Sequence, residues 1–353
     1  MMKNSKKTVA KKNIKINTDI FSAPENIKYI KDLVKQGSSF PRDEFCLFES
    51  LNNIFYLVYN SSINTTNNII FFDLKNEQIT SVIKNAHTEL INILKHYQDK
   101  KNRRDLLLTL SMDSVKLWNI NNLECLFYFN HIYDCGTIYS ACFINDNNKN
   151  YIITSHSDYP SNFGLIKIFD FNGNKYKEIN DSNDSTFFID TYYDNGLSQY
   201  FILTGNYDYV KSYDYSDNKV YHKYCDSIDH EKDKSVHISI TINDFKNVIK
   251  LIESSYDGNI RIWNFHSGDL IKKIYISAYQ LNGICLWNNK YLFVGCHDKN
   301  MKLINLDNEE IKDISGHKHY VLAIKKVIHP KLGECLISQG SLNDQIKLWT
   351  VKN

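Results

Sequence analysis

Residues 251–265, LIESSYDGNIRIWNF, contain the pattern that decides the fold. The stretch has a short apolar run, a tight turn at Asp257-Gly258-Asn259, and an alternating run that closes on Trp263. An Asp-Gly turn between two β-rich runs is a strong signal for a hairpin. The stretch therefore predicts two antiparallel strands, and variants of it recur along the chain.

The recurrence of this pattern predicts the architecture. Each variant alternates apolar and polar residues and closes on an aromatic residue or its replacement. The closing positions are Phe72, Trp118, Phe169, Tyr213, Trp263, Ile304 and Trp349. Their successive spacings are 46, 51, 44, 50, 41 and 45 residues, and such a period with four strands per unit is typical of a β-propeller. No amphipathic helix separates the runs, which disfavours a parallel sheet. We predict an all-β fold, a seven-bladed β-propeller of four-stranded antiparallel blades.

The chain divides into three parts. Residues 1–12 are lysine-rich and predict a basic disordered tail, with a nuclear-import or polyanion-binding arm as the alternative. Residues 13–43 are expected to hold an N-terminal closing strand and a short amphipathic helix. Residues 44–353 are the predicted propeller.

The short helix is predicted over residues 22–37. Ser22 and Glu25 suit a capping box, Pro24 suits the first turn, and Gly37 can end the helix. The apolar residues of its single stripe are Ile27, Ile30, Leu33 and Val34. We expect this helix to lie on the propeller, with a docking helix for a partner as the alternative.

The closing strand is expected because the last repeat supplies only three strands before the printed sequence ends. A strand from the N-terminal region would remove the exposed edge of that blade and join the two ends of the chain. The segment Ile14–Ile16 is the predicted closing strand, and a strand nearer residues 36–41 is the alternative.

The repeats resemble WD40 repeats over residues 44–353. Besides the closing aromatics, Ala86-His87 and Gly316-His317 are similar to the Gly-His pair that begins a blade in that family. A Ser or Thr in the second strand and an Asp in the next turn also recur. The unit around Trp118 has all four positions, and the last unit nearly does, with Asn343 as an alternative for its turn Asp. These sets are His87, Thr109, Asp113 and Trp118, and His317, Ser338, Asp344 and Trp349.

The resemblance implies that these sets are structural. A His bonded to a turn Asp and to a hydroxyl gives the buried polar groups of a blade their partners. The closing aromatic fills the wedge between neighbouring blades. Asp257 and Trp263 receive the same structural role. A hydrolase triad is not expected, because partial copies recur in several units and no G-x-S-x-G turn is present.

The resemblance also implies a binding face around the central channel. In the family, the residue before the turn Asp faces the wider loop surface, as do residues that flank the first apolar position of the first strand; the latter include Leu90, Asn92, Gln280 and Asn282 here. The predicted partner-binding residues are Tyr207, Tyr256, His297, Met112, Ser157, Tyr139, Tyr320 and Leu322. Aromatic side chains offer large contact area at low entropy cost, which suits a peptide anchor. Because the chain has 24 Tyr, chance exposure is the alternative.

The charge of the chain and the motifs that it lacks argue against several classes of partner and ligand. Without the six lysines that precede Asp19, 36 basic residues face 40 acidic ones, a difference of −4, so we expect no nucleic-acid partner. The DKKNRRD stretch at 99–105 is interpreted as a solvated loop, with a basic docking patch as the alternative. No apolar run suits a membrane helix. Metal-ligand spacings and phosphate loops are absent, so we expect no metal, cofactor or small-molecule substrate.

The predicted function is a non-enzymatic interaction scaffold. Such a protein binds peptide segments or subunits on the propeller face and helps assemble a multiprotein complex. The alternative is a substrate-recognition subunit of a ubiquitin ligase or another multisubunit enzyme, docked through the helix at 22–37. The first residues lack the apolar core of a secretory signal and the cysteines form no C-x-x-C pair, which favours the cytoplasm, with the nucleus as the alternative.

Overall fold

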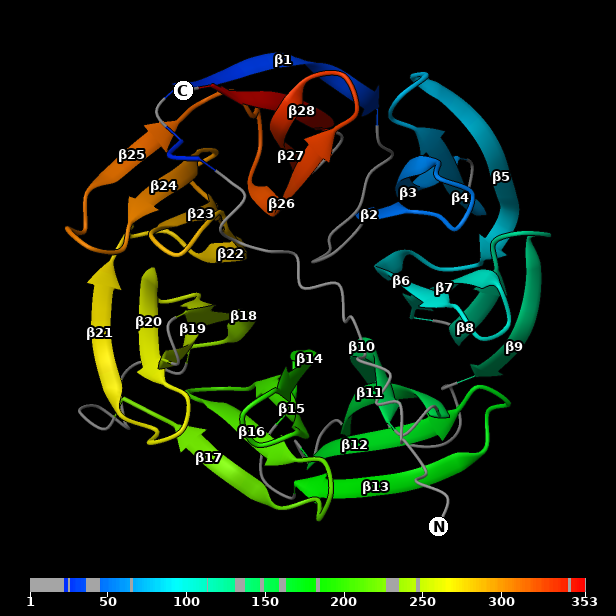
Figure 1. Cartoon of the computed structure of the whole chain (residues 1–353), viewed down its shortest axis with the longest axis horizontal. Coiled ribbons are helices and arrows are strands. Elements are labelled where there is room, and N and C mark those ends of the chain that lie inside the picture. Colours follow the sequence, from blue (N-terminus) through cyan, green and yellow to red (C-terminus); the bar gives the residue numbers. More distant parts are fainter. Residues whose placement is uncertain are drawn as a thin grey trace, which may run out of the picture.

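The protein is a seven-bladed β-propeller, as the repeats predict. The computed structural model describes residues 22–24, 26–35, 45–63, 66–112, 114–130, 137–146, 149–158, 163–181, 185–226, 235–245, 248–341 and 344–352. In these ranges, 28 strands form seven four-stranded antiparallel sheets, arranged as blades around a common centre (Figure 1). All seven closing positions lie in the third strands of their blades.

The strands of each blade follow one another from the centre outward. Blade 1 has β2 (Phe45–Glu49), β3 (Phe55–Ile63), β4 (Thr66–Asp73) and β5 (Gln78–His87). Blade 2 has β6 (Ile91–Asp99), β7 (Arg104–Ser111), β8 (Ser114–Asn119) and β9 (Glu124–Asn130). Blade 3 has β10 (Thr137–Asp146), β11 (Lys149–Asp158), β12 (Phe163–Asp170) and β13 (Lys175–Asp181).

The remaining blades keep this order, except that the last one combines the two ends of the described chain. Blade 4 has β14 (Phe188–Asp194), β15 (Gln199–Gly205), β16 (Val210–Asp214) and β17 (Val220–Tyr224). Blade 5 has β18 (His237–Phe245), β19 (Val248–Ser255), β20 (Asn259–Asn264) and β21 (Leu270–Tyr275). Blade 6 has β22 (Leu281–Leu286), β23 (Tyr291–Cys296), β24 (Met301–Asn305) and β25 (Ile311–Ile314). Blade 7 has β26 (Val321–His329), β27 (Gly333–Gly340), β28 (Gln345–Lys352) and β1 (Asn26–Lys35).

The hairpin of residues 251–265 forms as predicted, between β19 and β20. Its turn contains Gly258, whose φ of 81° lies in the left-handed region. A Cβ atom at this position would lie 1.8 Å from the carbonyl oxygen of Ser277. Glycine is therefore required both by the backbone conformation and by the close approach of the neighbouring chain.

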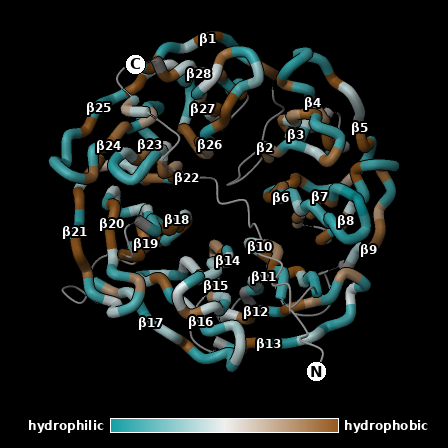
Figure 2. The backbone as a smooth tube through the Cα atoms, viewed as in Figure 1, coloured by the Kyte–Doolittle hydropathy of each residue, from teal (hydrophilic) through white to brown (hydrophobic). Residues whose placement is uncertain are grey.

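The hydrophobic core is divided among the interfaces between blades. Seven clusters of buried apolar side chains each combine residues from two neighbouring blades, and together they complete the ring. Trp118, for example, packs with residues of blade 1, and Trp349 packs with residues of blade 6. Figure 2 shows the hydrophobic residues spread around the whole ring rather than gathered in one place. Six of the seven closing residues, all except Phe169, lie in these clusters and fill the wedges between blades.

Hydrogen bonds between inner strands add to this packing. The hydroxyl of Ser140 on β10 accepts the backbone N–H of Ile189 on β14 at 3.1 Å. The side-chain amide of Asn282 on β22 donates to the carbonyl of Val321 on β26 at 2.9 Å. These bonds satisfy buried polar groups and hold neighbouring inner strands in register.

The closing strand exists, but it lies elsewhere than predicted. Strand β1 (Asn26–Lys35) pairs antiparallel with β28 and completes blade 7. The helix predicted over residues 22–37 is therefore wrong for this segment. Ser22, expected to cap that helix, instead accepts a hydrogen bond from the indole of Trp287 at 2.7 Å. The segment Ile14–Ile16 and residues 36–41 lie outside the described residues.

Two irregularities explain why this strand looked like a helix. The pairing of β1 with β28 shifts register around Ile30 and around Leu33. Each bulge adds one residue, so the two-residue alternation of a strand is broken. Ile27, Leu33 and Val34 all pack against buried clusters, although their spacing also fits one face of a helix. Pairing with β28 overrides that local pattern. No helix in the described ranges has the length and hydrophobicity needed to cross a membrane.

The contribution of β1 to stability can be tested by core truncation. Replacing both Leu33 and Val34 by Ala removes side chains that pack against the interface of blades 7 and 1. We expect the free energy of unfolding, measured with urea, to fall by about 2 kcal/mol. Ile30→Ala is the matched control on the same strand, because Ile30 is 41% exposed; it should change the free energy by less than about 0.5 kcal/mol. Equal losses in both variants would contradict this role of β1.

Candidate functional site

Bulges in the inner strands build the candidate site. Strands β6, β10, β18, β22 and β26 each shift register against their neighbours near their first residues. A bulge re-aims a side chain by putting one extra residue on the strand. The residues added at these five places are Asn92, Tyr139, Ile238, Asn282 with Gly283, and Leu322. All of them except Asn92 line a cavity at the centre of the ring.

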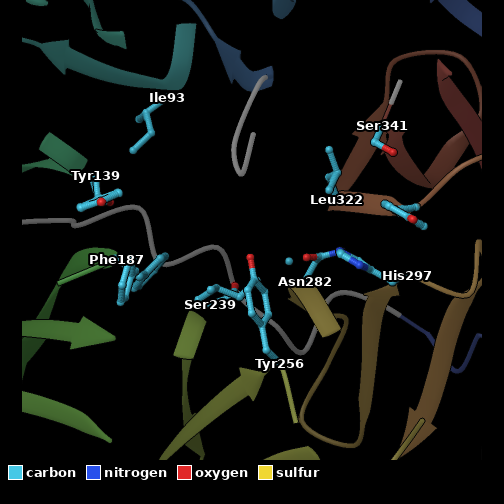
Figure 3. A pocket seen from close by; sticks show the side chains of 14 residues that line it. Ile93, Tyr139, Phe187, Ser239, Tyr256, Asn282, His297, Leu322 and Ser341 are labelled. Carbon is cyan, nitrogen blue, oxygen red and sulfur yellow. The ribbon is translucent and has the colours of Figure 1, made fainter. Parts of the chain in front are cut away.

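This cavity, the channel-mouth pocket, has a volume of about 280 Å³. Its walls come from six of the seven blades, blades 2 to 7. In Figure 3, Tyr139 and Phe187 lie on one side of the pocket, Leu322 and Ser341 on the other, and Tyr256 between them. The fourteen lining residues are Ile93, Tyr139, Ser140, Phe187, Phe188, Ile238, Ser239, Tyr256, Asn282, Gly283, His297, Tyr320, Leu322 and Ser341.

Two groups of aromatic side chains dominate the pocket. The rings of His297 and Tyr320 stack at 4.2 Å and are nearly parallel, at 6°. Tyr256 lies next to His297, with ring centroids 6.3 Å apart. On the other side, Tyr139 contacts Phe187 at 5.1 Å. Rings held by one another in this way have little conformational freedom to lose when a ligand binds.

The pocket is uncharged. None of its fourteen lining residues is Asp, Glu, Lys or Arg. Burial lowers the pKa of His297 from its ordinary value of 6.5, so the imidazole is neutral near pH 7. The surface therefore suits an apolar or neutral polar group better than a charged one, since a charge entering it would lose water without gaining a partner.

Ser341 adds a polar group that is not used within the blade. Its side chain is 4% exposed, and its hydroxyl has no hydrogen-bond partner among the described residues. Its backbone is fixed, because its N–H donates to the carbonyl of Tyr320 at 2.8 Å. The wall of the pocket therefore holds a buried hydroxyl whose hydrogen-bonding capacity no described residue satisfies.

The structure brings together five of the eight residues predicted for partner binding. Tyr139, Tyr256, His297, Tyr320 and Leu322 line the pocket. Of the other three, Met112 and Tyr207 do not line it, and the side chain of Ser157 lies outside what the structure describes. Met112 is 60% exposed in the turn after β7, Tyr207 contacts Phe187 edge-on at 4.7 Å outside the pocket, and Ser157 pairs with Thr137 within blade 3.

Several lining residues were missed by the sequence reasoning. Phe187 and Phe188 stand just before and at the start of β14, after a polar insertion that hides the beginning of blade 4. Ile238 points to the pocket only because β18 has a bulge. The adjacent aromatic residues Phe187 and Phe188 could have indicated this part of the pocket from the sequence. No residue pattern in the sequence indicates the bulge in β18.

The structural set forms as expected in blade 7. In blade 7, His317 bonds Asp344 at 2.9 Å and Ser338 at 2.7 Å, and the indole of Trp349 donates to Ser338 at 2.7 Å. Asp344, rather than Asn343, is thus the turn acid. Burial would raise the pKa of Asp344, but the hydrogen bond with His317 and backbone N–H donors hold it well below its usual range.

Blade 2 repeats the arrangement in the residues that can be described. His87 bonds the hydroxyl of Thr109 at 2.7 Å, and the indole of Trp118 donates to the same hydroxyl at 2.9 Å. Asp113 lies outside the described residues. The two blades therefore share a His, a hydroxyl and a Trp in one hydrogen-bonded chain.

Blade 5 departs from this arrangement. Glu253, which is fully buried, occupies the position of the Ser or Thr and bonds His237 at 2.7 Å. Asp257 pairs with Arg261 rather than with a His. Trp263 is buried, but its indole N–H has no partner among the described residues. Asp257 and Trp263 thus remain in the blade interior, in a different network from that of blades 2 and 7.

Comparisons with known proteins assign no family to this chain: no protein-family model matches it, and no curated protein is similar enough to be counted as a relative. Within the described ranges, no group of three or more His, Cys, Asp or Glu side chains is placed to hold a metal ion.

Two serines of blade 7 test which residues stabilise the fold: Ser338 belongs to the structural set and Ser341 lines the pocket. Ser338→Ala leaves His317 and Trp349 without their shared partner, so the free energy of unfolding should fall by about 2 kcal/mol. Ser341→Ala is the matched control, because its hydroxyl has no partner and its loss should change stability by less than about 0.5 kcal/mol. Denaturant titration of both variants measures the difference. A loss in Ser341→Ala as large as that in Ser338→Ala would contradict these assignments.

Proposed function

We propose that this protein is a non-catalytic interaction scaffold that binds a peptide segment of a protein partner in the channel-mouth pocket. The observation that carries this proposal is the pocket itself: an uncharged, aromatic cavity at the mouth of a propeller. Its volume of about 280 Å³ is just below the range of roughly 300–1,000 Å³ found for drug-sized ligands. That size suits one or two side chains of a peptide.

The ligand group that best fits the pocket is an apolar or aromatic side chain with a neutral polar end. The stacked His297 and Tyr320 rings and Tyr256 offer flat surfaces for an apolar body. In this proposal the unpaired hydroxyl of Ser341, a residue of the pocket wall, turns toward the ligand and bonds its polar end. Rigid aromatic anchors around a cavity are typical of the residues that contribute most to protein binding.

We also propose that the blades are WD40 repeats. The hydrogen-bonded His, hydroxyl and Trp in blades 2 and 7 support this assignment, as does the spacing of the closing residues. The assignment fits a scaffold that assembles a multiprotein complex in the cytoplasm or nucleus.

The alternative role, a substrate-recognition subunit of a ubiquitin ligase or another enzyme assembly, has no feature of the described residues in its favour. It relied on a docking helix at residues 22–37. That segment contains β1, which pairs with β28 inside blade 7. The scaffold is therefore the only function proposed.

The role of the pocket is tested by removing its aromatic anchors. The double variant Tyr256→Ala, Tyr320→Ala should lose the proteins that co-purify with the wild-type chain, as measured by affinity purification with mass spectrometry. Its control is Tyr128→Ala, Tyr275→Ala, which removes two tyrosines that are 65% and 62% exposed on the outer strands β9 and β21. The control should keep every partner. Retention of all partners by the pocket variant, with its fold confirmed by circular dichroism, would refute this binding site.

A further inference from the structure

A groove lies between blades 2 and 3, at the end of the strands opposite the channel-mouth pocket. The channel-mouth pocket is at the end of the ring where β7 and β11 finish, whereas this groove lies where they begin. It has a volume of about 500 Å³ and is lined by the turns that follow β6 and β12 and by the first residues of β11. Residues 100–103 form the first of these turns, within the DKKNRRD stretch, and Arg104 begins β7.

The groove contains an arginine held in a fixed orientation. Asp99, whose side chain is 1% exposed, accepts a hydrogen bond from Nε of Arg104 at 2.9 Å. Burial opposes ionisation of Asp99, but hydrogen bonds from Asn102 and Arg104 lower its pKa below the ordinary value, so this carboxylate keeps its charge. The Nη atoms of Arg104 form no hydrogen bond or ion pair with another described residue, and the side chain is 28% exposed. One edge of the guanidinium is thus anchored, and its outer end can bind a planar carboxylate.

Other donors surround Arg104. The side chain of Asn150 accepts hydrogen bonds from Tyr97 at 2.5 Å and from Asn145, which fixes its amide so that its NH2 group remains free to donate. Lys149, the adjacent residue, is exposed and forms no ion pair with the residues that the structure describes. Asp170, the other acid of the groove, is occupied by its own turn, where Asn172 and Asn174 donate to it at 2.9 Å.

An aromatic surface adjoins these donors. Tyr176 stacks on Tyr151 with ring centroids 4.6 Å apart and is itself 50% exposed. Phe171 lines the groove and contacts Tyr97 edge-on at 5.7 Å. The groove therefore offers a cationic end and an apolar wall next to each other.

We propose that this groove binds an acidic peptide segment, with one carboxylate on Arg104 and Lys149 and an apolar side chain against Tyr151 and Tyr176. Carboxylate fits better than the phosphates of a nucleic acid, because only a few cations gather here and the chain outside its first residues has an excess of acids. This binding does not rest on the function of the channel-mouth pocket. Together, the two sites would let one propeller hold two partners on opposite faces.

The test uses the full chain and a short fluorescent peptide of alternating glutamate and phenylalanine, with binding followed by fluorescence anisotropy at low salt. The glutamate peptide should bind, and the same peptide with glutamine in place of glutamate should bind about tenfold more weakly. Arg104→Lys should weaken binding about tenfold, because lysine keeps the charge but loses the planar fork. Lys149→Gln should weaken it about threefold.

Controls separate this site from the rest of the molecule. Lys149 is exposed at the start of β11, so its variant should fold even if Arg104→Lys does not. Lys312→Gln on β25 removes an exposed lysine of blade 6 and should leave binding unchanged. Tyr256→Ala, Tyr320→Ala should also bind the glutamate peptide normally. The proposal is overturned if the wild type does not bind, if Lys149→Gln binds as tightly as the wild type, or if a phosphoserine peptide or a DNA oligonucleotide binds more tightly than the glutamate peptide.

Discussion

Packing between neighbouring blades is the interaction on which the rest of this structure depends. Every apolar cluster joins two blades, so each sheet has its faces buried only when both neighbours are present. An open ring would expose two such faces and one unpaired strand edge. Strand β1 prevents this, because it pairs with β28 and adds Leu33 and Val34 to the seam between blades 7 and 1.

The same ring separates residues that hold the fold from residues that face a ligand. Trp349 and His317 are buried in one hydrogen-bonded set with Ser338. Tyr320, three residues after His317, is exposed and stacks on His297 at the pocket. Aromatic residues of the fold, such as Trp349, and of the pocket, such as Tyr320, occur in the same blade. They differ in burial: the first is buried and the second is exposed. A rigid ring of this kind can vary its exposed aromatics without loss of stability.

The sequence was sufficient for the parts of the fold that repeat. The seven closing positions predicted the third strand of every blade, and the Asp257-Gly258 turn predicted its hairpin. Features that occur once were harder to predict. Residues 22–37 fit a helical pattern because two bulges in β1 imitate its spacing. In the pocket, Tyr256 and His297 were predicted because each stands just before the Asp of a turn. Ile238 was not predicted because it reaches the pocket through a bulge in β18. Phe187 was not predicted because a polar insertion obscures where blade 4 begins.

The central claim is that the aromatic pocket of the closed ring selects an uncharged peptide side chain. Selection from a random peptide library, displayed on phage and panned against the full chain, tests it most directly. The account predicts enrichment of peptides that share an apolar or aromatic residue with a neutral polar end, and loss of that enrichment when panning is repeated on Tyr256→Ala, Tyr320→Ala. Enriched peptides that share a charged residue instead, and that bind the double variant as tightly as the wild type, would contradict it.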